Sequence, residues 1–304
     1  MESLDLYILG CGSANPTQKH QPASQVLSTR GKNYMVDCGE GTQVRFARLG
    51  LSMKRLGHIF ISHAHADHCL GLPGLICTMS LLGRTSQLHI HAPQELKEFL
   101  DSALQLFCPN LDFQVRFHEV DTTQHQIVHE DRTMEVWSLP LRHRVPCCGY
   151  LFREKQGSRH ILRDMIDMYE IPISQINNIK AGMDWTLEDG TLIPNDRLTA
   201  PPSPTRSYAY CSDTAPQPTL AAQIQGVDLL FHEATFGKDD EFRARQTFHS
   251  TTIEAAKVAH KAKAGRLVIG HYSSRMRDET RLLAEAQAIF PNTVLADEGL
   301  HLTI

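Results

Sequence analysis

Residues 59–74 read Ile59-Phe-Ile-Ser-His63-Ala-His65-Ala-Asp67-His68-Cys-Leu-Gly71-Leu-Pro-Gly. The apolar residues at the start of this stretch predict a short buried strand. Three histidines and an aspartate follow at once, and Gly71 stands near the start of an apolar helical pattern. The polar cluster is therefore expected on a loop at the end of a core strand, where a rigid scaffold can present it to a cleft.

Imidazole and carboxylate groups are ligands of Zn²⁺ and similar metal ions. Four candidate ligands so close together suggest two metal ions, because one side chain can fill only one site. In an extended segment, His63 and His65 point the same way, whereas Asp67 and His68 lie past the turn. The pattern His-x-His-x-Asp-His thus favours metal ligation over four unrelated polar residues.

The motif His63-Ala-His65-Ala-Asp67-His68 resembles the signature of the metallo-β-lactamase superfamily of metal-dependent hydrolases. The resemblance implies an α/β fold, a four-layer αββα sandwich with a dinuclear site at the edge of its two sheets. It does not imply a substrate, because the superfamily cuts many kinds of bond.

The composition is that of an ordinary globular protein, with 41% hydrophobic and 21% charged residues among 304. No signal peptide or membrane span is expected, because residues 1–6 lack a basic region before an apolar core and no apolar run is long enough. The eight cysteines include no Cys-x-x-Cys pair and are expected to be free thiols in a reducing cytoplasm. The net charge of −4 argues against non-specific nucleic-acid binding.

The hydrophobic pattern predicts one domain over residues 1–304. Strands are expected at residues 4–9, 25–28, 33–36, 59–61, 87–92, 113–120, 134–139, 149–153, 206–211, 227–231 and 267–270, with two short strands at the end. Helices are expected at residues 43–49, 72–82, 93–107, 251–263 and 278–289. Residues 153–206 change character, with a short helical stretch, a turn after Trp185 and the sequence Pro-Pro-Ser-Pro. They predict an inserted arm without a core of its own.

Further polar groups follow other predicted strands. Residues at one end of the strands of a layered fold can converge on one cleft. Together with the cluster at residues 63–68, these groups are His143, Asp213, His232-Glu233 and His271. Even without the His232-Glu233 pair, they supply enough ligands for two metal ions.

This wider set resembles the ribonuclease Z family, the zinc-dependent endonucleases that mature the 3′ end of tRNA, in its short form. The match runs from about residue 5 to the C-terminus. Besides the first histidine cluster, it rests on Leu9-Gly10-Cys-Gly12-Ser, Asp37-Cys-Gly39-Glu40, Gly71-Leu-Pro-Gly74, Ser212-Asp213-Thr214, His232-Glu233-Ala-Thr-Phe236, His249-Ser250-Thr251 and Gly270-His271. The His-Glu-Ala-Thr stretch with the downstream His-Ser-Thr is what distinguishes this family within the superfamily.

The resemblance implies roles for individual residues. The implied ligands of the two zinc ions are His63, His65 and His143 for one ion and Asp67, His68 and His271 for the other. Asp213 would bridge the ions, and a hydroxide between them would be the nucleophile. Asp67 is also the implied general base. Glu233 and His249 would deliver a proton to the leaving 3′ oxygen, because a carboxylate raises the proton affinity of an adjacent imidazole and orients it.

The resemblance further implies precursor tRNA as the substrate and a cytoplasmic homodimer in which the arm of one subunit holds tRNA bound at the other. The arm carries seven Lys or Arg and eight Asp or Glu residues, whereas the family's arm is usually rich in Gly, Pro and Lys. This balance favours, as an alternative, a hydrolase of small phosphodiesters. A non-catalytic RNA-binding scaffold is disfavoured by the intact ligand set. A diiron oxidoreductase is disfavoured because His65 stands where such proteins usually have Glu.

Overall fold

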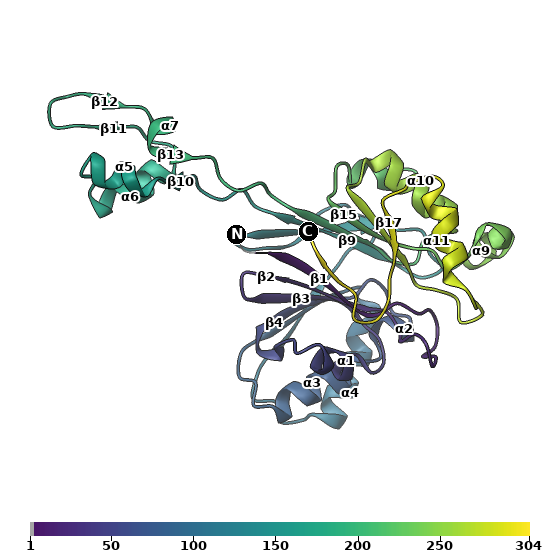
Figure 1. The fold of residues 1–304 in the computed structure, drawn as a ribbon. Coiled ribbons are helices and arrows are strands. Elements are labelled where there is room, and N and C mark those ends of the chain that lie inside the picture. Colours follow the sequence, from purple (N-terminus) through teal and green to yellow (C-terminus); the bar gives the residue numbers. More distant parts are fainter. Residues whose placement is uncertain (1–2) are drawn as a thin grey trace. The chain divides into compact units, whose positions relative to one another are not determined.

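A computed structural model describes residues 3–304. Two seven-stranded sheets pack face to face, and helices cover the outer face of each sheet (Figure 1). This is the αββα sandwich that the histidine motif predicts. The sandwich comprises residues 3–130, Val136–Phe152 and Arg206–Ile304.

The first sheet carries the histidine cluster. In spatial order its strands are β18 (His301–Thr303), β1 (Leu4–Gly10), β2 (Ser24–Thr29), β3 (Lys32–Cys38), β4 (Leu56–Phe60), β5 (Leu88–Ala92) and β6 (Val115–Glu119). From β3 to β6 the pairing is parallel. The helices α1 (Thr42–Arg48), α3 (Leu72–Leu81) and α4 (Glu95–Phe107) bury an apolar face of this sheet that includes Ile59 and Ile90. Two single turns, η1 (Met53–Arg55) and α2 (Ala66–Cys69), complete this half.

The second sheet is parallel through four of its strands. Its order is β17 (Thr293–Leu295), β16 (Arg266–Gly270), β15 (Leu229–Glu233), β14 (Ser207–Cys211), β9 (Cys148–Glu154), β8 (Met134–Pro140) and β7 (Ile127–Glu130). Its helices are α8 (Leu220–Gln223), α9 (Glu241–Thr247), α10 (Thr252–Ala262) and α11 (Glu279–Gln287), with the turn η2 (Lys238–Asp240). A capping box between Thr251 and Glu254 opens α10. Buried alanines on α10 let the helix approach the sheet closely.

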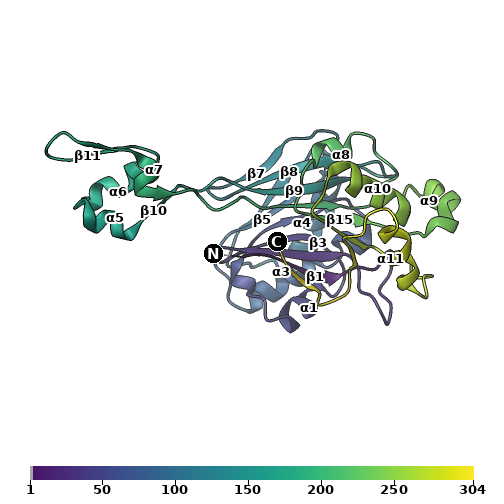
Figure 2. The same ribbon diagram turned by 45° about the horizontal axis from the view of Figure 1, so that its top comes forward.

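The remaining unit is formed by Asp131–Glu135 and Arg153–Thr205. It contains the hairpin-like pairs β10 (His160–Ile161) with β13 (Thr199–Ala200) and β11 (Trp185–Thr186) with β12 (Leu192–Ile193), and the helices α5 (Arg163–Met168), α6 (Ile173–Lys180) and α7 (Asn195–Leu198), labelled in Figures 1 and 2. The expectation that this segment has no core of its own is wrong. Its short elements bury one apolar cluster, made of Ile171, Ile179, Ile193 and Leu198. Each element is too short for its periodicity to reveal that cluster.

Other features also differ from the sequence-based expectation, among them the unpredicted short helices α8 and α9. Strand β7 was not predicted, because its four residues carry almost no alternation. The prediction of eight free thiols is wrong for Cys77 and Cys108, which form a disulfide. Cys77 lies in α3 and Cys108 directly follows α4, and the packing of these helices brings the two Cα atoms to 6.0 Å. A spacing of 31 residues gives no sign of that contact in the sequence. The other six cysteines are buried free thiols.

None of the helices within residues 3–304 has the length and apolar composition needed to cross a membrane.

Candidate metal centre

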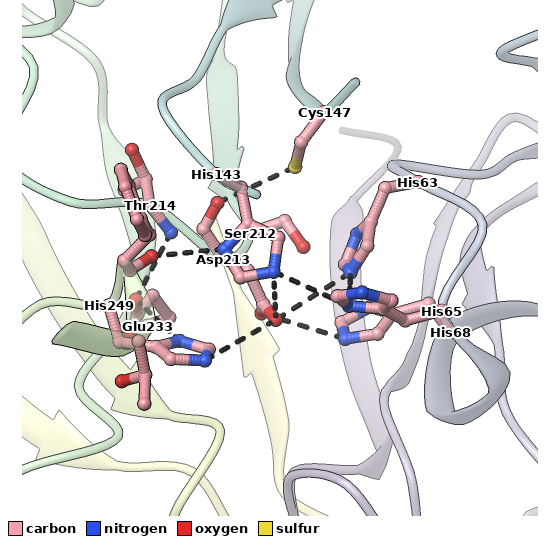
Figure 3. Close-up of polar contacts among 12 residues, drawn as sticks. His63, His65, His68, His143, Cys147, Ser212, Asp213, Thr214, Glu233 and His249 are labelled. Carbon is pink, nitrogen blue, oxygen red and sulfur yellow. Dashed lines mark hydrogen bonds and ion pairs between the residues drawn. The ribbon is translucent and has the colours of Figure 1, made fainter. Parts of the chain in front are cut away.

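The predicted metal ligands meet at one edge of the sandwich. They follow the ends of β4, β8, β14 and β16, so side chains from both sheets reach the same space. Figure 3 shows most of them directed toward Asp213. The residues that the structure brings together are His63, His65, Asp67, His68, His143, Asp213 and His271.

One group of ring nitrogens lies near Oδ2 of Asp213. Nε2 of His63 is 3.6 Å and Nε2 of His143 is 3.7 Å from this oxygen. Nδ1 of His65 lies 3.0 Å from Nε2 of His63 and 3.3 Å from Nε2 of His143. Ligand atoms around one zinc ion are spaced in this way, since each zinc–nitrogen bond is about 2.1 Å long.

The other oxygen of Asp213 faces a second group. Oδ1 lies 3.5 Å from Nε2 of His68 and 3.3 Å from Nε2 of His271. Oδ2 of Asp67 is 3.4 Å and 3.5 Å from the same two nitrogens. Oδ1 of Asp213 is buried and has no hydrogen-bond partner among the described residues. Because each oxygen faces a different group, the carboxylate is placed to serve two cations at once.

Hydrogen bonds on the far side of the rings orient the nitrogens. Nδ1 of His143 donates to the carbonyl oxygen of Phe248 at 3.0 Å. A neutral imidazole that donates from Nδ1 has a lone pair on Nε2, and this atom points at Asp213 and His65. A lone pair directed at a carboxylate is unfavourable unless a cation lies between them. This donor set therefore fits a metal ion.

The pKa directions agree with that fit. Burial and the neighbouring His68 lower the pKa of His63, so its ring is neutral. Burial alone would lower the pKa of His68 too, but the carboxylates of Asp67, Asp213 and Asp37 raise it well above its usual value. Without metal, the site thus draws a proton toward three carboxylates. A metal ion supplies the same positive charge.

Glu233 and His249 form a pair beside the candidate ligands. Oε1 of Glu233 lies 3.1 Å from Nδ1 of His249, and Nε2 of His249 lies 3.9 Å from Oδ2 of Asp213. Burial alone lowers the pKa of His249, but the charges of Glu233 and Asp213 raise it to about 9. The imidazole is therefore protonated at neutral pH in the metal-free protein and stands next to the metal centre.

Comparison with known proteins fixes the family of this chain. Ribonuclease Z of Bacteroides fragilis is 52% identical over 304 residues, with 100% of both chains covered. The chain belongs to the ribonuclease Z family. Ribonuclease Z of Porphyromonas gingivalis is 50% identical, again over 100% of both chains. As a ribonuclease Z family chain with the metallo-β-lactamase fold, it is a metal-dependent endoribonuclease.

Other comparisons bear on the fold of this ribonuclease Z chain. Residues 4–155 match the family model described as anti-Pycsar protein Apyc1, and residues 197–272 match the beta-lactamase superfamily domain. The crystal structure of human tRNase Z, short form, superposes with a TM-score of 0.72 at 24% identity and covers 99% of each chain. The αββα architecture is thus shared over the whole length.

Asp37 is a residue of the site that the sequence reasoning missed. Its side chain is fully buried. Oδ2 accepts hydrogen bonds from Nδ1 of His68 at 2.8 Å and from the hydroxyl of Tyr210 at 2.6 Å, while Oδ1 accepts from the backbone N–H of Ser62 at 2.8 Å. Asp37 thus orients His68 from behind. The signal in the sequence was a carboxylate ending an apolar run in the Asp37-Cys-Gly-Glu-Gly turn.

The glycine turn after Asp37 allows the backbones to approach closely. A Cβ atom on Gly39 would lie 2.5 Å from the carbonyl oxygen of Asp67, and one on Gly71 would lie 2.1 Å from the carbonyl oxygen of Gly39. Any side chain at either position would push the turn away from the ligand loop.

Strained backbone conformations are concentrated around the candidate metal centre. Seven non-glycine residues in the described chain have positive φ, and four of them touch the site: Ala14, Asp37, Phe248 and His271. Such conformations cost energy and persist only where the surroundings fix them. For example, the N–H of Ala14 donates to Oδ2 of Asp67 at 2.7 Å. The fold therefore holds these candidate ligands in positions that local preferences alone would not give.

His232 is a predicted polar group that does not join the site. It lies within β15, next to Glu233, and side chains alternate between the two faces of a strand. Its Nδ1 donates to the carbonyl oxygen of Glu233 at 2.7 Å. His232 is accordingly a satisfied core histidine.

Proposed function

We propose that this chain cleaves precursor tRNA at its 3′ side, leaving a 3′-hydroxyl on the tRNA, with two zinc ions in its metal centre. The relatives called ribonuclease Z support the RNA class, and the fold of human tRNase Z, short form, supports tRNA. The observation that carries the two-metal proposal is the division of Asp213, whose Oδ1 and Oδ2 face separate groups of ligands. Zinc is favoured because five of the seven ligands are imidazoles.

The proposed ligands of the first ion are His63, His65 and His143, those of the second are Asp67, His68 and His271, and Asp213 serves both. A two-metal site lowers the pKa of water and neutralises phosphate oxygens. The protein's own contribution is to hold these ligands from two sheets in fixed orientations. Asp37 does so for His68 and the carbonyl of Phe248 for His143.

Proton transfers are assigned to one proposed ligand and to the pair beside the metal centre. Asp67 is the proposed general base that takes a proton from the attacking water. His249 is the proposed general acid that protonates the leaving 3′ oxygen, and Glu233 keeps its ring protonated and oriented. General acid catalysis of this kind contributes roughly 10² to 10⁴-fold in rate.

An open groove next to His143 offers a path for RNA. Its volume is about 780 Å³, and it is lined by residues from the ends of β5, β6 and β8. The exposed Arg142 and Arg144 flank His143 in this groove. Guanidinium groups bind phosphate oxygens with paired hydrogen bonds. Glu95, Glu119 and Asp121 also line the groove, so Arg142 and Arg144 beside His143 are its candidates for phosphate contacts.

The arm, residues 153–206, is the proposed exosite for tRNA. We further propose a cytoplasmic homodimer in which the arm of one subunit holds tRNA bound at the other. Both proposals rest on the family, whose chains match over the full length including the arm.

Asp213→Ala tests the two-metal site. The full chain is loaded with zinc, freed of excess metal, and assayed on a 3′-extended tRNA and on bis(p-nitrophenyl) phosphate. The wild type is expected to bind two ions in the centre and to release a tRNA with a 3′-hydroxyl. The variant is expected to lose metal and nearly all turnover on both substrates, because removal of a shared carboxylate leaves excess positive charge.

The matched control is Asp101→Ala, which removes an exposed carboxylate on α4. It should behave as wild type. Retention of both ions and of the wild-type rate in Asp213→Ala would remove Asp213 from the bridge. Rapid hydrolysis of the aryl ester with no cleavage of any tRNA would instead favour the small-phosphodiester alternative.

A further inference from the structure

A second cluster of imidazoles lies away from the metal centre. Five of the 17 histidines gather on the inner face of the first sheet and on the facing edge strand of the second: His58, His89, His91, His118 and His129. The parallel register of β4, β5 and β6 pairs His58 with His89 and His91 with His118, so all four stand on one face. His129 reaches them from β7 of the other sheet, labelled in Figure 2.

Three of these rings have the spacing of metal ligands. Nδ1 of His58 lies 3.1 Å from Nε2 of His91. The ring centres of His58 and His129 are 4.0 Å apart, and one nitrogen from each of the three rings lies within 4.8 Å of the other two. Two nitrogens on one tetrahedral zinc ion are about 3.3 Å apart, as follows from bonds of about 2.0–2.1 Å. The cluster is therefore close to a three-imidazole ligand set.

His91 supplies an independent observation. It is 2% exposed, and its Nδ1 has no hydrogen-bond partner among the described residues. Within residues 3–304, its Nε2 has only Nδ1 of His58 as a partner. Other buried histidines donate from Nδ1 to an oxygen, as His143 and His232 do. The described protein groups thus leave this buried ring incompletely hydrogen-bonded, which is costly and calls for a further partner on one of its two nitrogens.

We propose that His58, His91 and His129 bind a divalent transition-metal ion, such as Zn²⁺ or Ni²⁺, at a site separate from the metal centre. Three imidazoles without a carboxylate select ions of this class over Mg²⁺ or Ca²⁺. The two sites are separate because His58 lies five residues before His63, a proposed ligand of the metal centre. Five residues span roughly 16 Å along an extended chain. Water can complete the coordination, because His58 and His129 are only half-buried.

The ion would join the inner face of the first sheet to the edge strand β7 of the second. His58 and His91 belong to the first sheet and His129 to the last strand of the second. An ion that binds the folded protein and not the unfolded chain stabilises the fold in proportion to the logarithm of its concentration over Kd. The site thus has a structural role, and it does not depend on the proposed reaction.

The experiment compares the wild type with the double variant His58→Gln/His129→Gln, which leaves the buried His91 in place. The matched control is His260→Gln, an exposed histidine on α10. Each protein is titrated with Zn²⁺ and separately with Ni²⁺, and bound metal per chain and Tm are measured. The wild type and the control are expected to bind one ion more than the double variant. At saturating metal, their Tm should rise by several degrees more than the Tm of the double variant does.

Equal metal content and an equal rise in Tm in all three proteins would overturn the proposal. If the double variant does not fold, the readout is the imidazole NMR signals of the wild type, recorded as metal is added beyond that bound by the metal centre. Unchanged signals of His58, His91 and His129 would overturn it as well. Cleavage of RNA by the folded double variant at the wild-type rate, with one ion lost, separates this site from the proposed function.

Discussion

Oε1 of Glu233 lies 3.1 Å from Nδ1 of His249, and the carboxylate that makes this contact is completely buried. The same carboxylate accepts hydrogen bonds from the backbone N–H groups of Thr214, Thr235 and Ser250. Three separate segments therefore fix its position. A carboxylate held this firmly orients the histidine ring and keeps it protonated. The charge of the pair, and not its packing alone, is therefore what the proposed proton delivery depends on.

Glu233→Gln and His249→Ala should lower the rate of RNA cleavage while both metal ions stay bound. We expect a loss of roughly 10² to 10⁴-fold for His249→Ala, the usual contribution of a general acid. Glu233→Gln should lower the rate by a smaller factor, because the amide keeps the shape of the carboxylate but not its charge. Hydrolysis of bis(p-nitrophenyl) phosphate should change much less, since nitrophenolate leaves without a proton.

The control for both variants is Glu241→Gln, an exposed carboxylate in α9. Equal losses on RNA and on the aryl ester, in either variant, would indicate that the pair positions the substrate or supports the fold instead of delivering a proton.

Asp37→Asn should weaken metal binding without removing a ligand. The carboxylate accepts a hydrogen bond from Nδ1 of His68, and loss of such a partner typically costs 10–100-fold in metal affinity or activity. Activity should therefore return toward the wild-type value when the metal concentration is raised. Metal titrations followed by tRNA cleavage measure this. If excess metal gives no recovery while the variant remains folded, Asp37 does not act through the metal.

The sandwich and the seven candidate ligands that the structure gathers were expected from the sequence because the motifs behind the family resemblance are short and local. His63 to Asp67 follow one buried strand within a few residues, and other candidates also follow strand ends. Asp37 was not recognised because its partners, His68 and Tyr210, are distant in the chain. The orienting carbonyl of Phe248 could not be predicted at all, because it depends on a residue at a φ of 58°.

Contacts between distant elements account for the other features that the sequence did not reveal. The disulfide between Cys77 and Cys108 depends on how α3 and α4 pack, which no local pattern encodes. The cluster around His91 depends on the register of three parallel strands and on an edge strand of the other sheet. In the sequence these histidines are scattered over 72 positions, from His58 to His129. Their convergence therefore required the tertiary structure.

A buried charge cluster between His20, near the start of the chain, and two glutamates near its end predicts that stability depends on pH. Nδ1 of His20 lies 2.9 Å from Oε2 of Glu298, and its Nε2 lies 3.1 Å from Oε1 of Glu279. Burial alone lowers the pKa of His20, but the two carboxylates raise it above 6.5. Burial raises the pKa of Glu298, but the contact with His20 and the backbone N–H of Gln21 hold it below 4.5.

The raised pKa of His20 and the lowered pKa of Glu298 stabilise the fold over different pH ranges. A raised histidine pKa adds stability that is complete below 6.5 and is lost as pH rises through the folded-state value. A lowered Glu298 pKa adds stability that is present above 4.5 and is lost as pH falls. The cluster should therefore stabilise most between these values.

Urea unfolding at several pH values, with His20→Asn compared to wild type, tests this. The difference in the free energy of unfolding should be largest between pH 4.5 and 6.5 and should shrink above and below that window. His260→Asn, an exposed histidine, is the control and should show no such window. A difference that does not vary with pH would show that His20 contributes packing and not charge.

The arm differs from the sandwich in the kind of surface it offers. Within residues 153–206, basic and acidic residues nearly balance. Several large apolar side chains are exposed there instead, with Ile173 at 87% and Met168 at 67%. Single basic residues are therefore poor candidates for the main contact with tRNA. The whole surface, charged and apolar together, is the better candidate for an exosite.

Replacing residues 155–205 by a short Gly-Ser linker should raise KM for precursor tRNA strongly and leave hydrolysis of bis(p-nitrophenyl) phosphate largely intact. None of the proposed ligands lies in the arm, so its loss removes remote binding energy without touching the site. The matched comparison is Arg163→Gln/Lys180→Gln/Arg197→Gln, which keeps the arm but removes three of its basic side chains. This triple variant should raise KM less than the deletion does. Steady-state kinetics at two salt concentrations measure both effects, and the tRNA activity of the intact chain should fall with added salt as phosphate contacts weaken. Unchanged tRNA cleavage after the deletion would mean that the arm is no exosite, and dimer contacts would then be its remaining role.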